Sequence, residues 1–525
     1  MCSSKRLAPV WSVAVGLFGF VQLSAEQPPG PASAVIDVGS RRELFVDNFL
    51  VAQLAGRAEL RLHHPEPQEI VMVFDAPWEG NATAYNAVFK DGNRYRMYYR
   101  AWNLSVTPSG VEPGDNPQIA CYAESDDGIH WRRPNLGLHE FKGSKQNNIL
   151  FVRGEIGGVK NENGAPAVFR DDNPATAADA RYKTFVHYIK YGNGMLPLKS
   201  PDGLVWSPMS PNPAITDPHR NAFDSQVCAF WDAVRGEYRA YWRYFEKSDG
   251  GRAIRTATSK DFLHWENRAD LKYVDSPPEE LYENYIAPYF RAPQVLIGFP
   301  VRYVERGWSD SMRALPELEN RENRARSSER YGTALTETLF MASRDGVMFK
   351  RWNEAFVRPG PERPGTWNYG HLYSGWQVVE TKAVIAGEPN ELSLYASEGY
   401  WSGHANGGHS SALRRYTLRL DGFVSAQAPM SGGELISKPL RFSGRQLALN
   451  FATSAAGSVR VEIQDANGQP FPGFTLDDCP PIFGDTIERP VTWKQGTDVS
   501  AVAGQAIRLR FVLKDADVYA FQFQP

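Results

Sequence analysis

Cysteine is scarce in this chain, with only four in 525 residues. Cys121, Cys228 and Cys479 lack the spacing of metal ligands, and although an exported protein could form a disulfide, the sequence requires none. A phosphate-binding loop, a zinc motif and a Ser-His-Asp spacing are also missing. The sequence therefore implies no metal site and no required cofactor, while a structural calcium ion stays open.

An excess of one charge sign is absent too. Lys and Arg number 57 and Asp and Glu number 60, which gives a formal net charge of −3. We therefore expect no nucleic-acid partner, because phosphate binding needs clustered positive charge. The one charge-dense stretch, residues 313–330, mixes both signs and is interpreted as a solvated helix or loop.

Long apolar runs are absent except at the amino terminus. Lys5 and Arg6 precede the apolar stretch 7–23, and small residues follow it, which is the pattern of a secretory signal over residues 1–25. The stretch is shorter than the roughly 20 residues that a membrane span needs, and no second one follows. We therefore expect an exported protein, periplasmic or extracellular, whose mature chain begins near Glu26 without a membrane span. An uncleaved membrane anchor is the alternative.

A short phrase, Ser-x-Asp-Gly followed by an aromatic residue, returns four times. Asp bonds its own backbone and Gly tolerates a positive φ, so the phrase favours a tight turn, and the aromatic residue returns the chain into a packed sheet. The third copy has Phe262 in place of Gly, and the fourth ends in Phe349 in place of Trp. Such self-similarity predicts a repeat architecture. The copies cover residues 125–131, 200–206, 259–265 and 343–349.

Two strand-like runs precede each copy. With the strand that ends at the phrase and the strand after it, they make a four-stranded blade. A further set of runs without the phrase predicts a fifth blade, closed by residues 35–51. The first runs cover 85–90, 166–170, 226–231 and 286–290, the second runs cover 95–100, 182–188, 238–243 and 295–302, and the fifth set covers 377–385, 391–396 and 413–420.

The predicted fold is therefore all-β, with a five-bladed β-propeller over residues 35–430. Short alternating strands and turns follow from residue 431 onward, and they predict a small β-sandwich over residues 431–525.

An exported five-bladed propeller with Ser-x-Asp-Gly-x-x-Trp turns, followed by a β-sandwich, resembles the glycoside hydrolases of the invertase, fructanase and arabinanase superfamily. The Asn-Asp-Pro-Asn and Arg-Asp-Pro signatures of invertases are absent, so a fructose-specific activity is not implied. The resemblance implies a hydrolase that cleaves a glycosidic bond of a carbohydrate. It also implies carboxylates at the start of the innermost strands, around the central axis.

Four acids precede the predicted inner strands: Asp75 and Glu79 in the first blade, Asp224 in the third and Glu283 in the fourth. Glycoside hydrolysis needs one carboxyl group that protonates the leaving oxygen and another that acts as base or nucleophile. The tyrosines around Glu283 are expected to raise its pKa and to suit it to be the acid. Asp75 or Glu79 is then the base or nucleophile, and Asp224 tunes their charge.

Three arginines, Arg100, Arg243 and Arg302, each end a predicted second strand. An antiparallel hairpin returns this end of the strand to the face where the acids are expected. Unless each arginine only pairs with an acid, its planar fork favours a sulfated or uronic sugar. The predicted substrate-binding side chains are Trp78, Arg100, Arg243, Tyr285, Arg302 and His371, with Trp102 and Trp367 as further stacking surfaces.

Two other functions stay open. A glycoside phosphorylase would use the arginines for inorganic phosphate, and a propeller without activity would bind glycan or protein through the same face. His404 and His409 lie in a Gly-rich stretch that could hold a metal, although a loop is the preferred interpretation. The oligomeric state is not predicted.

Overall fold

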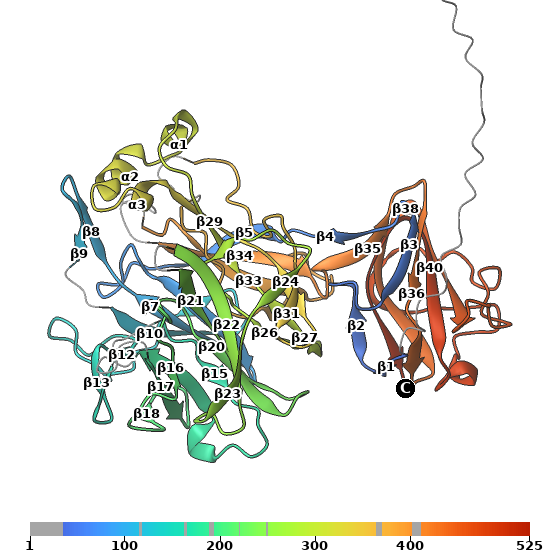
Figure 1. Cartoon of the computed structure of the whole chain (residues 1–525), viewed down its shortest axis with the longest axis horizontal. Helices are drawn as coiled ribbons and strands as arrows, with labels where there is room; N and C mark the ends of the chain where they lie inside the picture. Colours follow the sequence, from blue (N-terminus) through green and yellow to red (C-terminus); the bar gives the residue numbers. More distant parts are fainter. Residues whose placement is uncertain are drawn as a thin grey trace, which may run out of the picture.

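The structure is a computed structural model, and almost all of its regular elements are strands (Figure 1). The expected signal segment, residues 1–25, lies outside the described residues. Within the described part of the chain no helix is long and apolar enough to cross a membrane. The structure describes residues 35–114, 118–161, 165–187, 194–219, 221–247, 250–363, 370–401 and 411–525.

Five antiparallel four-stranded sheets, the blades, form the left part of the molecule in Figure 1. The predicted repeat is therefore confirmed. Their strands are β6 (Ala84–Asp91), β7 (Arg94–Ala101), β10 (Ile119–Ser125) and β11 (Trp131–Arg132); β15 (Phe169–Arg170), β16 (Tyr182–His187), β17 (Gly194–Ser200) and β18 (Ser207–Pro208); β20 (Cys228–Asp232), β21 (Glu237–Lys247), β22 (Gly250–Ser259) and β23 (Trp265–Asp270); β26 (Ala287–Tyr289), β27 (Ala292–Gly298), β30 (Met341–Ser343) and β31 (Met348–Arg351); and β32 (Val379–Thr381), β33 (Glu391–Glu398), β34 (Ala412–Arg419) and β5 (Glu66–Val73).

Short strands extend or accompany the blades. β12 (Ile149–Val152) pairs with β10, β19 (Ile215–Thr216) with β17, and β24 (Lys272–Val274) with β31, while β13 (Gly154–Ile156) pairs with β14 (Val159–Asn161). The 3-10 helices cover Ala178–Ala180 and Ser500–Val502.

The repeated phrase forms the turn between the third and fourth strands of blades one to four. In the second copy the Ser200 hydroxyl accepts a hydrogen bond of 2.8 Å from the amide of Gly203, and Asp202 Oδ1 accepts bonds from the next two amides. The other three copies repeat this arrangement. Phe262 adopts φ 68° where the other copies have Gly, and its ring stacks on Phe185 in the second blade at 4.6 Å. Packing against the preceding blade therefore compensates for the backbone strain.

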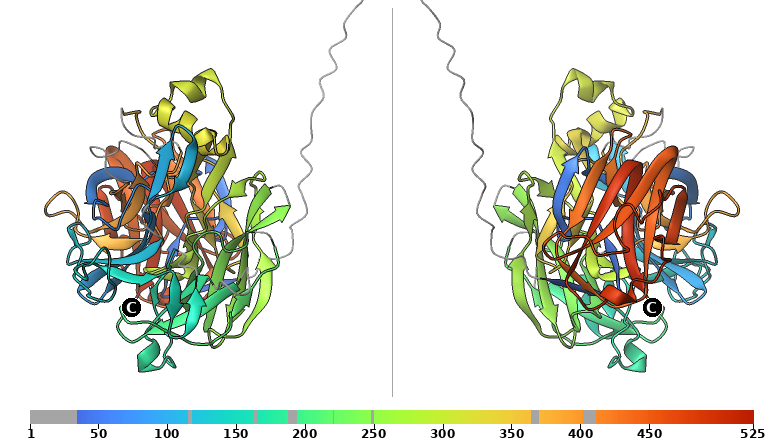
Figure 2. Two further views of the ribbon diagram at one scale, coloured as in Figure 1. Left: turned by 90° about the vertical axis from the view of Figure 1, so that its left-hand side faces the viewer. Right: turned by 90° about the vertical axis from the view of Figure 1, so that its right-hand side faces the viewer.

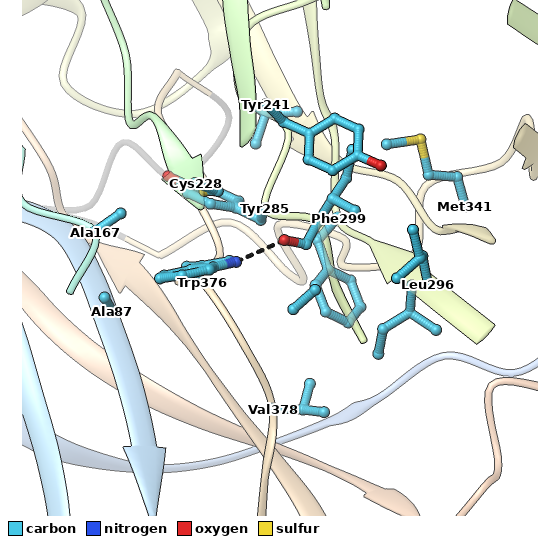
Figure 3. Packing of buried hydrophobic residues seen from close by; sticks show 14 of the residues in the cluster. Ala87, Ala167, Cys228, Tyr241, Tyr285, Leu296, Phe299, Met341, Trp376 and Val378 are labelled. Carbon is cyan, nitrogen blue, oxygen red and sulfur yellow. Dashed lines mark hydrogen bonds between the residues drawn. The ribbon is translucent and has the colours of Figure 1, made fainter. Parts of the chain in front are cut away.

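The inner strands surround one axis. Neighbouring inner strands contact one another from β32 through β6, β15 and β20 to β26. Trp376, just before β32, connects the first and last of these strands. Its backbone pairs with that of β6, and its indole N–H donates a hydrogen bond of 2.8 Å to the carbonyl of Ile286 beside β26. Figure 3 shows this indole between the small side chains of Ala87 and Ala167 and the ring of Tyr285. The fully buried Trp376 fills the centre of the propeller.

The fifth blade is closed by β5, which pairs with β34. The prediction that residues 35–51 close it was wrong. Those residues instead form strands that pair with the carboxyl-terminal part of the chain. The physical reason is that β5 has the length to run along β34, from Glu66 opposite Thr417 to Val73 opposite Ala412.

The carboxyl-terminal strands fold into a second body with its own hydrophobic core, drawn at the right of Figure 1 and facing the viewer in the right-hand view of Figure 2. Strand pairing places residues 36–62 and 424–428 in this body, which differs from the expected ranges 35–430 and 431–525. Its strands are β1 (Ile36–Gly39), β2 (Arg42–Leu44), β3 (Val51–Gly56), β4 (Glu59–Leu62), β35 (Val424–Ala428), β36 (Gly433–Ser437), β37 (Leu440–Phe442), β38 (Gln446–Asp465), β39 (Asp485–Pro490) and β40 (Ile507–Gln524).

An insertion in the fourth blade carries the only α-helices of the described residues. Its helices α1 (Asp310–Ala314), α2 (Leu318–Ala325) and α3 (Arg330–Thr333) lie between two strands of a three-stranded sheet. The strands of this sheet are β25 (Glu280–Leu281), β28 (Val301–Glu305) and β29 (Ala334–Thr338). Helix α2 contacts the hairpin of β8 (Leu104–Thr107) and β9 (Gly110–Pro113), and the two project together in Figure 2. The stretch 313–330 is therefore helical as interpreted, but it is not simply solvated, because Arg321 and Arg324 are buried.

Candidate functional site

A cavity of about 390 Å³ opens at the end of the propeller where the inner strands begin. Tyr85, just inside β6, and Arg100, near the end of β7, both line it, as the hairpin geometry predicts. The Ser-x-Asp-Gly turns lie at the other end, because a side chain at Gly128 would meet Tyr95 at the start of β7. The lining residues are Tyr85, Arg100, Trp102, Gln118, Ala165, His187, Asn221, Asp224, Ser225, Arg243, Phe245, Arg252, Tyr282, Tyr303, Arg330, Tyr331, Ala334, His371, Tyr373, Tyr400 and Trp401.

Glu283 follows the lining residue Tyr282 but does not itself line the cavity, and it is completely buried. Its Oε2 accepts a hydrogen bond of 3.1 Å from the backbone amide of Gln226, whereas Oε1 has no hydrogen-bond partner. Burial raises the pKa of Glu283 to about 8, although the positive charge of Arg243 and the amide of Gln226 act in the opposite direction. Glu283 therefore keeps its proton at neutral pH.

Asp224 stands at the entrance of the third blade, next to Glu283 in the fourth. Its side chain is 69% exposed, and its Oδ2 accepts a bond of 2.7 Å from the guanidinium of Arg243. Arg243 is itself buried, and its Nε and second terminal nitrogen have no partner. The structure thus brings together an exposed carboxylate and a buried protonated one, from adjacent blades.

Arg100 reaches the cavity from the first blade. Its guanidinium donates 2.9 Å to the hydroxyl of Tyr400 and lies over the ring of Tyr85 at 4.2 Å and over that of Trp102 at 5.3 Å. Its Nε is buried without a partner, and no carboxylate pairs with Arg100 among the described residues. Arg100 and Arg243 therefore line the same cavity, as predicted.

His371 lines the fifth-blade side of the cavity. Burial lowers its pKa well below the usual range, and the positive charges of Arg324 and Arg330 lower it further. Its Nε2 lies 3.0 Å from a guanidinium nitrogen of Arg324, which can only donate, so Nε2 accepts and Nδ1 carries the proton toward the hydroxyl of Tyr373 at 3.3 Å. His371 is therefore neutral.

The backbone is strained where the chain enters the cavity. Tyr85, Phe223 and Tyr285 have φ values of 61°, 66° and 45°, in a region that costs bulky residues roughly 1–3 kcal/mol each. Tyr285 is fully buried below the cavity, and its hydroxyl has no hydrogen-bond partner. Strain of this kind persists only where the surrounding structure enforces it, which marks this entrance as a candidate site.

Asp75, Glu79 and Trp78 do not reach the cavity. The loop before β6 turns them toward Arg133, which bonds both oxygens of Glu79 at 2.9 and 2.8 Å and Asp75 at 3.2 Å. Glu79 is buried and also accepts 2.6 Å from the hydroxyl of Tyr99, so it belongs to a satisfied ion pair. Trp78 donates to an amide oxygen outside the cavity. The position expected for the first-blade carboxylate is instead occupied by Tyr85.

Arg302 also lies elsewhere. Pro300 has no amide hydrogen, so β27 ends at Gly298 and the chain begins a new strand, β28. Arg302 in β28 pairs with Glu279 at 2.7 Å and with Glu337. It serves the three-stranded sheet of the insertion and not the cavity.

Several lining residues were not predicted from the sequence. Arg330 and Tyr331 come from the helical insertion, and Tyr400 and Trp401 follow a strand of the fifth blade. No motif marks them, because their position depends on how the insertion and the fifth blade fold over the first. Trp367, His404 and His409 lie outside the described residues. In the described ranges no cluster of three or more His, Cys, Asp or Glu side chains is placed to hold a metal ion.

No family model and no curated protein sequence matches this chain. Solved structures similar to it include an endo-arabinase from Bacteroides thetaiotaomicron, with 10% identity over 67% of this chain and 98% of that one and a TM-score of 0.39. They also include an exo-inulinase from Aspergillus awamori, with 11% identity over 88% and 99% of the two chains and a TM-score of 0.40. A thermostable family-43 glycoside hydrolase has 12% identity over 68% and 96% and a TM-score of 0.39. These are members of the superfamily that the turn motifs resemble, and at such values they say nothing about the activity of this chain.

Proposed function

We propose that this protein hydrolyses a glycosidic bond of an acidic carbohydrate, with Glu283 as the acid and Asp224 as the base. The observation that carries the proposal is this pair of carboxyl groups at one cavity. Glu283 is buried and protonated at neutral pH, whereas Asp224 is exposed and forms an ion pair with Arg243. Most glycoside hydrolases use two carboxyl groups, one held protonated and one ionised by different environments.

The reaction assigns one proton transfer to each carboxyl group. Glu283 gives its proton to the leaving oxygen as the bond between that oxygen and the anomeric carbon breaks. A water molecule attacks the anomeric carbon and gives its proton to Asp224. Because Glu283 is fully buried, the substrate has to displace a lining side chain before Oε1 meets the glycosidic oxygen, but Oε1 has no hydrogen bond to lose.

The arginines support an acidic substrate. Arg100 and Arg243 both have buried N–H groups without a partner, and a planar guanidinium matches the oxygens of a carboxylate or a sulfate. The aromatic side chains of Tyr85, Trp102 and Trp401 supply apolar faces beside them on which a sugar ring can stack. The signal pattern over residues 1–25 adds that the substrate is met outside the cytoplasm.

The test is a screen of the purified full-length protein against sulfated and uronic-acid-containing polysaccharides, with the products identified by mass spectrometry. We expect new reducing ends from at least one acidic polysaccharide. Each reaction is run with and without inorganic phosphate, because sugar phosphates formed only with phosphate would identify a phosphorylase. Cleavage of neutral glycans alone would contradict the acidic substrate.

A glycan-binding role without turnover is the second candidate, and the complete burial of Glu283 favours it. The two functions differ in what Glu283→Gln does. Binding without catalysis leaves affinity unchanged and shows no turnover in either protein. Hydrolysis predicts turnover in the wild-type protein that the variant loses.

A further inference from the structure

Positive charge is unevenly distributed around the cavity. On the side of blades three and four, Arg243 pairs with Asp224 and Arg252 pairs with Glu280 at 2.5 Å. On the side of blades five and one, next to the helical insertion, Arg100, Arg324 and Arg330 have no carboxylate partner among the described residues. This second side is called the arginine wall below.

Arg324 in α2 is the most constrained member of the arginine wall. It is 1% exposed, and its guanidinium donates only to neutral acceptors, the carbonyl of Trp401 at 3.2 Å and Nε2 of His371 at 3.0 Å. It also lies over the indole of Trp401 at 4.5 Å, and its Nε has no partner. Burial without a counter-charge lowers the pKa of Arg324 to about 9. A buried cation in this state is stabilised by any anion that approaches it.

Arg100 and Arg330 bring this charge to the cavity surface. Both line the cavity, Arg100 from the first blade and Arg330 from the start of α3 in the insertion. The hydroxyl of Tyr400 accepts a hydrogen bond from Arg100. Burial raises the pKa of Tyr400, and the positive charges of Arg100 and Arg324 act in the opposite direction. Arg324 and Arg330 likewise act on His371, which also lines the cavity, so the three positive charges converge on one small region.

The insertion is held in this position by the first blade. The amide of Val111 in β9 donates 2.7 Å to the hydroxyl of Ser327, and Arg326 donates to the carbonyl of Pro108. Arg324 and Arg330 lie on either side of these two residues in the sequence. Docking of the insertion on the β8–β9 hairpin thus fixes the arginine wall relative to the cavity.

We propose that the arginine wall is a subsite for one anionic group of the substrate, with Arg100 and Arg330 as its contacts and Arg324 as the charge behind them. The proposal rests on the hydrolytic function proposed above and extends it. The sugar bound in the cavity carries a carboxylate or sulfate that points toward blades five and one. Its glycosidic bond then faces Glu283 and Asp224 on the opposite side. Arg330 of the insertion and Arg100 of the first blade together select acidic substrates.

The experiment measures binding, so it does not depend on turnover. Calorimetry at neutral pH and low ionic strength compares four probes: glucuronate, glucose 6-sulfate, glucose and inorganic phosphate. At least one acidic sugar is expected to bind tenfold or more tightly than glucose, and the preferred one tells a carboxylate subsite from a sulfate subsite. Equal binding of glucose and both acidic sugars, no binding of either acidic sugar, or binding of phosphate alone would overturn the proposal.

Variants locate the subsite. Arg100→Met and Arg330→Met are each expected to reduce the affinity for the acidic sugar at least tenfold and to leave glucose binding unchanged. Arg313→Met is the matched control, because Arg313 lies in α1 of the same insertion and pairs with Glu322 at the surface. Arg330→Lys, which keeps the charge, guards against loss of folding and should retain part of the affinity. Unchanged affinity for the acidic sugar in both Arg100→Met and Arg330→Met would contradict the proposed subsite.

The two proposals fail differently. Suppose that Glu283→Gln binds glucuronate or glucose 6-sulfate like the wild-type protein, and that neither protein hydrolyses any glycan. The subsite is then supported and the hydrolytic function is contradicted. If Arg330→Met hydrolyses acidic and neutral glycans at wild-type rates, the hydrolytic function is supported and the anionic subsite is contradicted.

Discussion

The backbone amide of Gln226 donates a hydrogen bond of 3.1 Å to Oε2 of Glu283 and so ties the entrance of the third blade to that of the fourth. Gln226 is two residues beyond Asp224, and its side chain donates 2.9 Å to the carbonyl of Tyr85 in the first blade. One short segment therefore positions both carboxyl groups relative to the strained entrance of β6. The Arg243 guanidinium then holds the carboxylate of Asp224 at 2.7 Å.

The stability of the protein should depend on pH through Glu283. Its pKa rises from an ordinary value of 4.5 to about 8 in the folded state, so between these values the folded chain holds a proton that the unfolded chain has lost. The free energy of unfolding then falls as pH rises from about 4.5 to 8, by up to roughly 5 kcal/mol from this group. Urea unfolding of wild type and Glu283→Gln across this range measures it. The variant should show the weaker pH dependence, and parallel profiles would contradict the assignment.

Glu79→Gln should destabilise the protein without entering the reaction. The substitution leaves Arg133, which is partly buried, without its main counter-charge, and breaking such a pair costs about 3 kcal/mol. The midpoint of urea unfolding is expected to shift, while the turnover of the folded enzyme stays within about twofold of wild type. Asp224→Asn is the comparison. It also removes the counter-charge of a buried arginine, Arg243, so it is expected to lower stability as well, but unlike Glu79→Gln it should abolish turnover. A loss of turnover in folded Glu79→Gln would restore it as a candidate base.

The Ser-x-Asp-Gly turn of the second blade should not tolerate a side chain in place of Gly203. Its φ is 80°, and an added Cβ would lie 2.4 Å from the hydroxyl oxygen of Tyr98 in the preceding blade. Gly203→Ala is expected to cost at least about 2 kcal/mol from strain and overlap together. Gly236 has φ 64° with nothing within 4 Å, so Gly236→Ala reports strain alone and should cost about 1 kcal/mol. Equal unfolding free energies in the two variants would show that the turn does not pack on the neighbouring blade.

Sequence patterns were sufficient for the repeat because its signals are local. Each Ser-x-Asp-Gly copy satisfies its own backbone, so four turns and the strands on both sides of them follow from short segments. The closing strand β5 was missed, because pairing of Glu66 with Thr417 joins segments far apart in the chain. No local pattern in 35–51 or 66–73 distinguishes the two as partners for the fifth blade.

The site was predicted in part for the same reason. Glu283 and Asp224 each stand four residues before an inner strand, β26 and β20, at the cavity end of the propeller. Glu79 stands five residues before β6, and its contact with Arg133 depends on a loop conformation that the sequence does not reveal. Arg302 was misplaced because one proline ends β27. The pattern around Arg324 is that of a surface residue in a charged helix, and its burial depends on the docking of the insertion on the first blade.

The most direct test of the central claim is the turnover of Glu283→Gln on the natural substrate identified by the screen, compared with a glycoside of the same sugar that carries a good leaving group. A lost general acid should lower the rate on the natural substrate by about 10² to 10⁴-fold. The activated glycoside needs little protonation and should lose much less. This split between the two substrates is the result that the account predicts. Wild-type turnover of the natural substrate by Glu283→Gln, or equal losses on both substrates, would contradict it.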